Sequence, residues 1–516
     1  MKQPYTTLLL ALIILFQLTA CSHLPNNLDK IKTYAFEETE TRLSQDLQPF
    51  IEQHPSNEAG FRLLGDNLDA FSSRIILIDS AEKSIDAQYY AVEDQLTGKL
   101  FLKHLLDAAD RGVRVRLLVD DLKTDKRDAM FASLDSHPYM SVRAFNPFAF
   151  RTFSSLNFLT EFPRLDRRMH NKSFNVDNII SIVGGRNIGD KYFSASNELE
   201  FKDLDVLCVG HNISNQVSTV FDSYWNDPYA YPFMKLHQPE ANDLSLNEIR
   251  ETFNLYNEQE KNNIYTQHAK NSNIIKQLKS GEVKLAWGEG KIYSDSPKQA
   301  RTPRKENSYS MSPQILALAN ESQEDILIIS PYFIPQYWGE DVFGAWRKRG
   351  IRVRVITNSL ASNDVQSVHA EYAKYRKKLL KMGVELYELK PNHSSNTSGI
   401  KSKVSGLHAK SFIFDKRRIF IGSMNLDPRS IVLNTEMGIL IKNIALSKEL
   451  NDWVDNNIND FAYKVELKQE DGMEQLEWIE KTSDGQTIVY HHEPQIGLLK
   501  RMGIDFLKIL PIEGEF

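Results

Sequence analysis

The chain has 516 residues, more than one hydrophobic core usually supports, so we expect two domains that each bury a sizeable interior. Its 62 Lys and Arg residues face 68 Asp and Glu residues, which gives a net charge of −6. This balance argues against a general nucleic-acid binder, whose affinity depends on an excess of basic residues, although it leaves room for a local basic cluster.

Residues 1–21 have the pattern of a targeting segment: Lys2 at the charged end, an apolar run over residues 8–16, and small residues before Cys21. The pattern resembles the bacterial lipoprotein signal, in which the cysteine is lipidated and becomes the mature N-terminus. The alternative is an uncleaved anchor, but the run is shorter than the roughly 20 residues that span a bilayer. The resemblance implies a lipoprotein anchored to a bacterial membrane and facing the periplasm, with the inner and outer membranes both open.

The segment that follows is polar. Residues 22–50 are rich in Glu, Asn and Gln, and we expect a linker between the anchor and the folded body. Cys208 is the only other cysteine and lies in an apolar run, so we expect it to pack as a small hydrophobic residue and predict no disulfide framework.

Two strand-helix-strand units repeat each other along the chain. The expected elements are a strand at 84–90, a helix at 100–109 and a strand at 113–119, and again a strand at 326–330, a helix at 342–349 and a strand at 351–357. The hexapeptides Arg111–Arg116 and Arg349–Arg354 are nearly identical. Units of this length predict parallel strand pairs in a duplicated α/β sandwich.

These patterns divide the chain into consecutive segments. They are the targeting segment 1–21, the linker 22–50, a first α/β domain at 51–230, a helical connector at 231–280, a second α/β domain at 281–465 and a C-terminal extension at 466–516. The end of the extension, residues 494–516, mixes apolar and basic residues. That mixture is typical of an amphipathic helix at a bilayer surface and of an ordinary packed terminal helix.

Each half also carries the same short motif at the same spacing. The first copy is His170-x-Lys172, Asp177 and Gly184-Gly185-x-Asn187, and the second is His408-x-Lys410, Asp415 and Gly422-Ser423-x-Asn425. Each copy has the pattern of a β-hairpin, with outgoing strands at 169–176 and 407–414 and returning strands at 179–183 and 419–421. His and Lys, two residues apart on a strand, would face the same side, and the Asp at the turn would hold the hairpin through local hydrogen bonds.

Paired His, Lys and Asn residues suit the chemistry of a phosphodiester. One imidazole attacks phosphorus, the other protonates the departing alcohol and activates the incoming one, and Lys and Asn neutralise the phosphoryl oxygens. The two imidazoles must therefore titrate apart, and nearby carboxylates would set this: Glu436 after the second motif, and Asp203 or Asp205 after the first. Neither a metal ion nor another cofactor is required.

The candidate site residues follow from these roles. The motif residues assigned to catalysis are His170, Lys172, Asp177, His408, Lys410 and Asp415; those assigned to phosphate binding are Asn187, Asn425 and Ser423; and the carboxylates assigned to histidine orientation are Asp203 and Glu436.

The doubled motif resembles the signature of the phospholipase D superfamily, His-x-Lys-x4-Asp twice per active site, and the resemblance covers the chain from about residue 60 onward. Within the superfamily, several stretches are similar to the bacterial cardiolipin synthase C group: residues 86–90, 164–172, 183–190, 357–362, 364, 369–370 and 510–513. The resemblance implies two phospholipase D-type α/β sandwich domains packed around one active site. It further implies a phosphohistidine on His170 and an acid/base role for His408, with the reverse order open.

The resemblance also implies the substrates. A phosphatidyl group from phosphatidylethanolamine or phosphatidylglycerol would pass to a second phosphatidylglycerol at the membrane surface, and a small accessory protein is conceivable for this group. Water as acceptor would give phospholipase D hydrolysis instead. A phosphodiesterase acting on nucleic acid is less favoured because of the net charge. The family commonly has Ser at the position of Gly185, so the two motifs are not equivalent.

Overall fold

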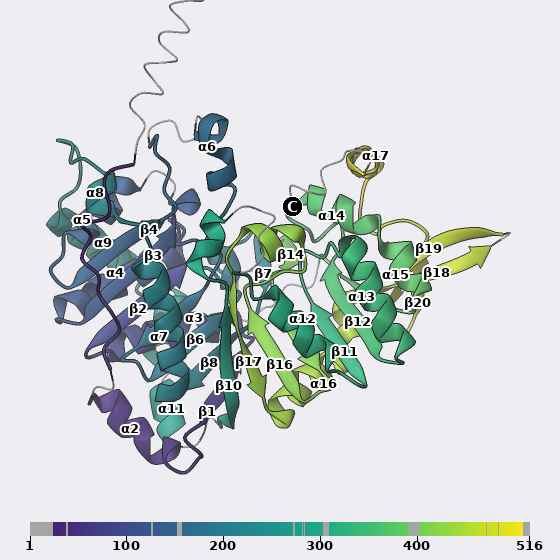
Figure 1. Cartoon of the computed structure of the whole chain (residues 1–516), viewed down its shortest axis with the longest axis horizontal. Coiled ribbons are helices and arrows are strands. Elements are labelled where there is room, and N and C mark those ends of the chain that lie inside the picture. Colours follow the sequence, from purple (N-terminus) through teal and green to yellow (C-terminus); the bar gives the residue numbers. More distant parts are fainter. Residues whose placement is uncertain are drawn as a thin grey trace, which may run out of the picture.

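The computed structural model describes most of the chain (Figure 1). The described residues are 24–37, 40–124, 127–151, 157–271, 274–280, 282, 284–302, 309–391, 402–470, 472–482 and 484–508. The predicted targeting segment with Cys21 lies outside them, as does the stretch 510–513. Within the described ranges, no helix is both long enough and apolar enough to cross a membrane.

A single mixed sheet runs through both halves and contains 18 strands in the described part of the chain. Its two rows meet at the antiparallel pair β1 (Glu58–Leu64) and β10 (Ala286–Ser294). Outward from β1 lie β8 (Asp205–Val209), β6 (Ile180–Gly184), β5 (Ser173–Val176), β2 (Ser84–Tyr89), β3 (Arg114–Asp120), β4 (Met140–Phe145) and β9 (Ala230–Pro232). Outward from β10 lie β17 (Met437–Lys442), β16 (Arg418–Gly422), β15 (Ser411–Phe414), β11 (Asp325–Ile329), β12 (Arg352–Asn358), β13 (Glu385–Leu389) and β18 (Ala462–Glu470).

Every step in one row has the same strand direction as the matching step in the other. In both rows two parallel pairings, β2–β3–β4 and β11–β12–β13, follow a run of antiparallel ones. The predicted duplication and the predicted α/β class are therefore confirmed. The rows are joined edge to edge, because β1 and β10 extend one sheet from domain to domain instead of leaving two separate sheets.

Helices cover both faces of this sheet (Figure 1). On one face α7 (His211–Trp225) and α16 (Ile444–Phe461) occupy equivalent places after β8 and β17. The other face is covered by α3 (Asn67–Ser80) and α4 (Leu96–Asp110) in the first half, and in the second by α12 (Ser312–Asn320), α13 (Gln336–Lys348), α14 (Gln366–Ala373) and α15 (Arg376–Lys381).

The strands are apolar on both sides because both faces are covered. In β8, Leu207 packs in the core under α3 and α4, whereas the neighbouring Cys208 packs in the core that α7 and α16 share. Cys208 is a buried free cysteine. The core under α7 and α16 contains residues of both halves, so it connects the two domains.

The connector 231–280 is helical and lies on the first domain. It contains α8 (Phe233–Leu236), α9 (Leu246–Gln259), α10 (Ile264–Asn271) and α11 (Ile274–Lys279). Ile249, Phe253 and Tyr265 are buried in the core of the first domain. The other α-helices in the described part of this half are α2 (Arg42–Ile51), α5 (Asp128–Asp135) and α6 (Asn157–Leu165).

Residues 24–37, expected to belong to a polar linker, lie along the first domain instead. The indole Nε1 of Trp225 donates to Oγ1 of Thr33 over 2.8 Å, and Nη1 of Arg116 donates to the carbonyl of Thr33 over 2.9 Å. Asn27 donates from Nδ2 to the carbonyl of Ala230 over 2.8 Å. The polar composition that suggested a solvated linker reflects these hydrogen bonds to the domain surface.

The C-terminal extension starts later than expected. The boundary at residue 465 falls inside β18, which continues the sheet and forms a projecting hairpin with β19 (Met473–Lys481), followed by β20 (Thr487–Tyr490) and α17 (Leu498–Leu507) (Figure 1). Ile504 of α17 is buried against Leu360 and Ala370. This contact is that of a packed terminal helix, the second of the two interpretations of residues 494–516.

Candidate active site

A cleft with a volume of about 330 Å³ lies where the two halves meet and is lined by residues of both. His170 and Asn187 come from the first motif, and His408 and Asn425 come from the second. The fold thus gathers around one space four side chains that are far apart in the sequence. One shared cleft is the arrangement that the duplicated motif predicts.

A short contact between the halves fixes the first histidine. Met169 and Thr435 form an isolated parallel bridge, and the main-chain N–H of His170 donates to the carbonyl of Thr435 over 2.8 Å. The residue after Thr435 is Glu436, so this register places the carboxylate beside the imidazole. Nδ1 of His170 lies 3.0 Å and 2.9 Å from the two carboxylate oxygens of Glu436.

The second histidine is fixed in the same way with the halves exchanged. Strand β14 (Val404–Leu407) pairs in parallel with β7 (Leu199–Lys202), and the N–H of His408 donates to the carbonyl of Lys202 over 2.8 Å. Asp203 follows Lys202, and its Oδ2 lies 2.6 Å from Nδ1 of His408. Each imidazole therefore has a carboxylate from the opposite domain at Nδ1.

These contacts interrupt the hairpins expected from the sequence. The outgoing strands begin only at Ser173 and Ser411, so both His-x-Lys segments precede the strands and are not part of them. The physical reason is the exchange of partners: at this edge the chain leaves its own sheet and pairs with a segment of the other half.

The two lysines are buried beside the histidines. Nζ of Lys172 donates to the carbonyl of His170 over 2.5 Å, and Nζ of Lys410 lies 2.9 Å from Nδ1 of His408. Burial lowers the pKa of Lys172 well below its usual range and lowers the pKa of Lys410 to about 8. The cost of desolvating an ammonium group is the cause, and an anionic ligand in the cleft would offset it.

The histidines and their carboxylates have shifted proton affinities as well. Burial, together with the positive charges of the two lysines, holds the pKa of both imidazoles well below the usual range. Burial raises the pKa of Glu436 to about 7. Burial acts on Asp203 in the same direction, but the contact with His408 and nearby cations outweighs it, so the pKa of Asp203 is lowered. Both imidazoles are therefore neutral in the free cleft at neutral pH.

The two asparagines lie at the cleft wall as the motif predicts. Nδ2 of Asn187 donates to the hydroxyl of Tyr192 over 2.9 Å, and Nδ2 of Asn425 lies 3.3 Å from Oγ of Ser430. The buried Oδ1 of Asn425 has no hydrogen-bond partner among the described residues. This oxygen is an acceptor, so the ligand group that suits it is a hydroxyl or another N–H or O–H donor.

Ser423, assigned from the sequence to phosphate binding, has a different contact. Its hydroxyl donates to Oε2 of Glu436 and accepts from the N–H of Met437 over 3.0 Å. The side chain is buried and holds the carboxylate that orients His170. The assignment to phosphate binding is corrected, because the returning strand turns the Ser423 side chain toward Glu436.

Gly185 is the equivalent position in the first half, and its lack of a side chain has a steric reason. A Cβ at this position would lie 2.2 Å from Oδ1 of Asp203. Asp203 is one methylene shorter than Glu436, and its Oδ1 accepts from the N–H of Leu204 over 2.8 Å instead of from a hydroxyl. Each half thus supplies a carboxylate that orients a histidine: the second half uses Glu436 with Ser423, and the first half uses Asp203 with Gly185.

The aspartates of the motif lie at the hairpin turns, away from the cleft. Asp177 accepts hydrogen bonds from the N–H groups of Glu82, Lys83 and Ser84 over 3.0, 2.8 and 2.9 Å. Asp415 accepts equivalent bonds at the start of β11. The sequence predicted local hydrogen bonds within each turn. The observed bonds are long-range instead, because each joins its hairpin to a strand about 90 residues earlier in the chain. The assignment of Asp177 and Asp415 to catalysis is therefore corrected: both side chains stabilise the fold.

Asp205, the alternative to Asp203 as the carboxylate that orients a histidine, has a structural role instead. Its Oδ2 lies 2.8 Å from Nη2 of Arg74 and 3.2 Å from Nη1 of Arg186. All three side chains are buried, so this is an ion-pair cluster inside the first domain.

Sequence reasoning assigned no role to several further residues of the cleft wall, namely Tyr90, Arg168, Tyr192, Tyr332, Asp364, Asp427, Arg429 and Ser430. Tyr90 packs edge-on against His170, and Tyr192 packs edge-on against His408, with ring centroids 5.1 Å apart in both pairs. The buried Nη2 of Arg168 has no hydrogen-bond partner among the described residues. A buried guanidinium N–H at the wall of the cleft is suited to an anionic oxygen.

Comparisons with known proteins agree with this arrangement. The sequence model described as "Cardiolipin synthase, PLD-like domain" matches the chain twice, at residues 75–225 and 315–458. Cardiolipin synthase C of Escherichia coli (strain K12) is 38% identical over 479 residues, which cover 92% of this chain and 99% of that protein. An uncharacterized protein of Helicobacter pylori (strain ATCC 700392 / 26695) is 32% identical over 411 residues, covering 78% of this chain and 79% of its own.

Among solved structures, phosphatidylserine synthase of Haemophilus influenzae Rd KW20 has a similar fold. The superposition has a TM-score of 0.53 at 15% sequence identity and covers 82% of this chain and 92% of that one. At this identity the likeness concerns the fold alone.

Proposed function

The chain belongs to the phospholipase D-like family of cardiolipin synthases, and from that premise we propose that it is a phosphatidyltransferase that forms cardiolipin through a phosphohistidine. The observation that carries the proposal is the pair of imidazoles in one cleft, each with a carboxylate of the opposite domain at Nδ1. Because Nδ1 is occupied, Nε2 of each ring is the nitrogen left for a substrate.

In the first step Nε2 of His170 attacks the phosphorus of the donor phospholipid. A phosphorus–nitrogen bond forms, the bond from phosphorus to the head-group oxygen breaks, and protonated His408 gives that oxygen its proton. Ionised Asp203 and the negative charge of the bound phosphodiester raise the pKa of His408 in the complex, which supplies the imidazolium. Burial raises the pKa of Glu436 to about 7, so near neutral pH this carboxyl carries less negative charge than Asp203 and stabilises an imidazolium less, which keeps His170 neutral.

In the second step neutral His408 accepts the proton of the terminal glycerol hydroxyl of phosphatidylglycerol. The oxygen attacks phosphorus and the phosphorus–nitrogen bond breaks, so cardiolipin forms and both histidines return to their starting states. The donor is phosphatidylglycerol or phosphatidylethanolamine, with glycerol or ethanolamine as the departing alcohol. Lys172 and Lys410, with Asn187 and Asn425, offset the charge on the phosphoryl oxygens.

The test is to incubate the purified chain with vesicles of phosphatidylglycerol, of phosphatidylethanolamine, and of both, and to identify the lipid products by mass spectrometry. Cardiolipin that requires phosphatidylglycerol is the expected result. Phosphatidic acid without cardiolipin would replace the proposal by phospholipase D hydrolysis, and cleavage of DNA without lipid turnover would replace it by a nuclease. Activity that appears only after addition of a cell extract would identify a requirement for an accessory protein.

We further propose that Cys21 carries a lipid that holds the protein at a bacterial membrane facing the periplasm. The lipoprotein-like pattern of residues 1–21 supports this, and so does the course of residues 24–37 along the first domain, which would keep the anchor close to the body. Cys21→Ser should abolish incorporation of labelled palmitate and release the protein from the membrane fraction. If Cys21→Ser kept both the palmitate label and the membrane association, the proposed anchor would be wrong. Fractionation of cells with the wild-type protein distinguishes the inner from the outer membrane.

A further inference from the structure

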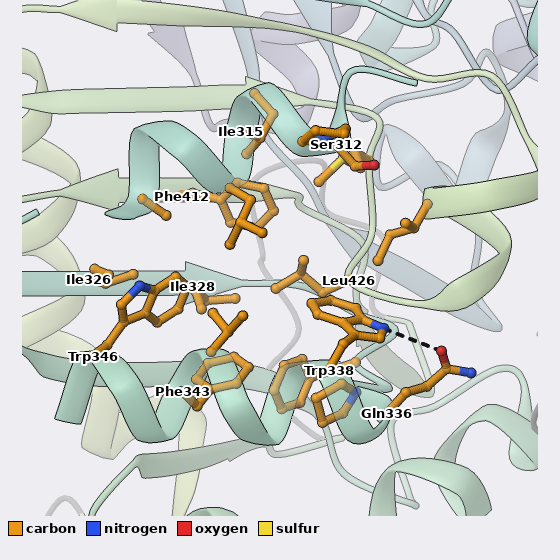
Figure 2. Close-up of a pocket in the computed structure, with 18 of the residues that line it drawn as sticks. Ser312, Ile315, Ile326, Ile328, Gln336, Trp338, Phe343, Trp346, Phe412 and Leu426 are labelled. Atoms are coloured by element: carbon orange, nitrogen blue, oxygen red, sulfur yellow. Dashed lines mark hydrogen bonds between the residues drawn. The ribbon is translucent and has the colours of Figure 1, made fainter. Parts of the chain in front are cut away.

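The second domain contains an apolar cavity of about 440 Å³ beside the catalytic cleft. It lies between α12 and α13 over the strands β11 and β15, and Figure 2 shows Ile315, Ile328, Phe343 and Phe412 pointing into it. These four side chains are buried, so the space is not a surface depression between exposed residues. Protein interiors rarely leave such a volume empty, and it falls in the range of 300–1,000 Å³ that is typical of ligand sites.

The cavity is elongated, and its two ends differ in exposure. Figure 2 shows Trp346 at one end and Trp338 with Gln336 at the other, and Nε1 of Trp338 lies 3.3 Å from Oε1 of Gln336. Trp346 is 5% exposed, whereas Trp338 is 37% exposed, so the more buried end is at Trp346 and the more open end at Trp338. An amphipathic indole at the more open end of an apolar cavity suits a boundary between water and hydrocarbon.

The wall between this cavity and the catalytic cleft is one backbone segment thick at three places. In each of the consecutive pairs Tyr332-Phe333, Asn425-Leu426 and Ser430-Ile431, the first side chain lines the cleft and the second lines the cavity. Phe333 and Leu426 form a parallel bridge that joins the first two segments, and Nδ2 of Asn425 donates to Oγ of Ser430 in the third over 3.3 Å. A polar site and an apolar site thus share one wall.

We propose that this cavity is an acyl-chain site that binds a hydrocarbon chain of the phospholipid whose phosphodiester occupies the cleft. The inference rests on the proposed function, because a phospholipid is the substrate class that carries both a phosphodiester and long hydrocarbon chains. Among the described residues that line the cavity, Ser312 and Gln336, both half-buried, are the only polar side chains apart from the two indoles, so the cavity favours the chain and rejects the head group. Chain burial would hold the lipid while the head groups exchange.

The variant Ala319→Phe tests the proposal, because Ala319 is buried on α12 and faces the cavity. The matched control is Ala317→Phe, which adds the same ring to an exposed position of the same helix. Filling a cavity leaves the melting temperature unchanged or raises it, so a fall in melting temperature is not the expected cause of any lost activity.

Turnover is compared for phosphatidylglycerol with 18-carbon chains, for phosphatidylglycerol with 6-carbon chains, and for bis(4-nitrophenyl) phosphate, which has no chain. Ala319→Phe should lower kcat/KM for the long-chain lipid at least about tenfold, the equivalent of two methylene groups kept out of the cavity. The 6-carbon lipid, which has less chain to bury, should lose less than the 18-carbon lipid. Bis(4-nitrophenyl) phosphate with this variant, and every substrate with the control variant, should stay within about twofold of the wild type. An equal effect on all three substrates, or no effect on the long-chain lipid, would overturn the proposal.

A binding measurement separates this proposal from the proposed function. Phosphatidylglycerol with brominated chains, presented in vesicles to the inactive His170→Ala protein, should quench the fluorescence of Trp346, measured as the difference from the same protein carrying Trp346→Phe. Ala319→Phe should remove this quenching. Quenching in the absence of any turnover by the wild type would support the acyl-chain site and reject the transferase function. Quenching that persists in Ala319→Phe would reject the acyl-chain site.

Discussion

His170 and Glu436 lie in opposite domains, and Nδ1 of the histidine is 2.9 Å from Oε2 of the glutamate. The equivalent contact between His408 and Asp203 crosses the boundary in the opposite direction, over 2.6 Å. Neither domain therefore contains a complete pair of imidazole and orienting carboxylate. Any displacement of one domain relative to the other would disturb both pairs at once.

Substitution of either histidine should remove turnover while the fold is retained. We expect His170→Ala and His408→Ala each to lower kcat with phosphatidylglycerol by at least about 10³-fold, because one supplies the nucleophile and the other the proton. The melting temperature should change little, since both side chains face the cleft.

The order of the two histidines can be read with bis(4-nitrophenyl) phosphate, whose leaving group needs no proton. His408→Ala should still release a burst of nitrophenol and accumulate a phosphoenzyme, because His170 can still attack phosphorus. Rapid acid quenching and mass spectrometry locate the phosphate. A phosphoenzyme in His170→Ala instead would reverse the assignment.

The activity should rise with pH up to about 7 and fall again above about 8, where Lys410 of the free enzyme loses its positive charge. Glu436 must be ionised to accept the Nδ1 proton of His170, and burial raises the pKa of Glu436 to about 7, so the protonated, less active form dominates below that pH. Profiles of kcat/KM between pH 5 and 9 check this. In Glu436→Gln the rise of kcat/KM with pH should disappear. If the rise persisted in this variant, another titrating group would be its cause.

Ser423→Ala should move the rise of kcat/KM to higher pH. The Ser423 hydroxyl donates to Oε2 of Glu436 and so lowers the pKa of this carboxyl, and its removal leaves the buried charge less stabilised. The expected loss of kcat/KM at pH 7 is about threefold to tenfold, since a single hydrogen bond to a charged group is removed. If Ser423 bound the substrate phosphate instead, KM would increase and the pH dependence would stay in place.

Gly185→Ser should lower activity although serine is the residue that the family commonly has there. The added Cβ would lie 2.2 Å from Oδ1 of Asp203 and would push this carboxylate away from His408. We expect kcat to fall by at least about tenfold with a smaller change in KM, because the acid/base residue loses its orientation. The double variant Gly185→Ser with Asp203→Ala serves as the control, and a further loss in it relative to Asp203→Ala would contradict this steric explanation.

Asp177→Ala should destabilise the protein and leave the chemistry of the folded molecules intact. Three main-chain N–H groups lose their acceptor, and alanine is less favourable than aspartate at the positive φ of 49°. The expected loss in unfolding free energy is about 2–4 kcal/mol, with kcat per folded molecule within about twofold of the wild type. Denaturant unfolding and active-site titration measure the two quantities, and Asp177→Asn, which keeps one acceptor, should fall between.

The sequence was sufficient for the repeated elements because their signals are local. Apolar runs such as Ile326–Ile329 are buried between two layers of helices and therefore stand out from polar neighbours. Repetition of the His-x-Lys spacing was also sufficient to predict that His170 and His408 share one site, and their shared cleft bears this out.

The roles of the remaining motif residues depended on contacts that spacing does not contain. Asp177 and Asp415 recur at a fixed distance from Lys in both copies, yet their partners are strand starts about 90 residues away. Ser423 follows a glycine in the returning strand, yet only the packing of that strand against Met437 turns its hydroxyl to Glu436. A pattern that recurs can therefore be structural as well as catalytic.

The sequence by itself determined that the chain is a duplicated α/β protein with paired His, Lys and Asn residues, because periodicity and repetition are properties of short segments. The tertiary structure alone decided which carboxylate serves which histidine. Glu436 reaches His170 and Asp203 reaches His408 through two parallel contacts between the halves, Met169 with Thr435 and Leu407 with Lys202. The register of strands from different domains is set by the packing of the joined sheet, and no segment of the chain encodes it alone.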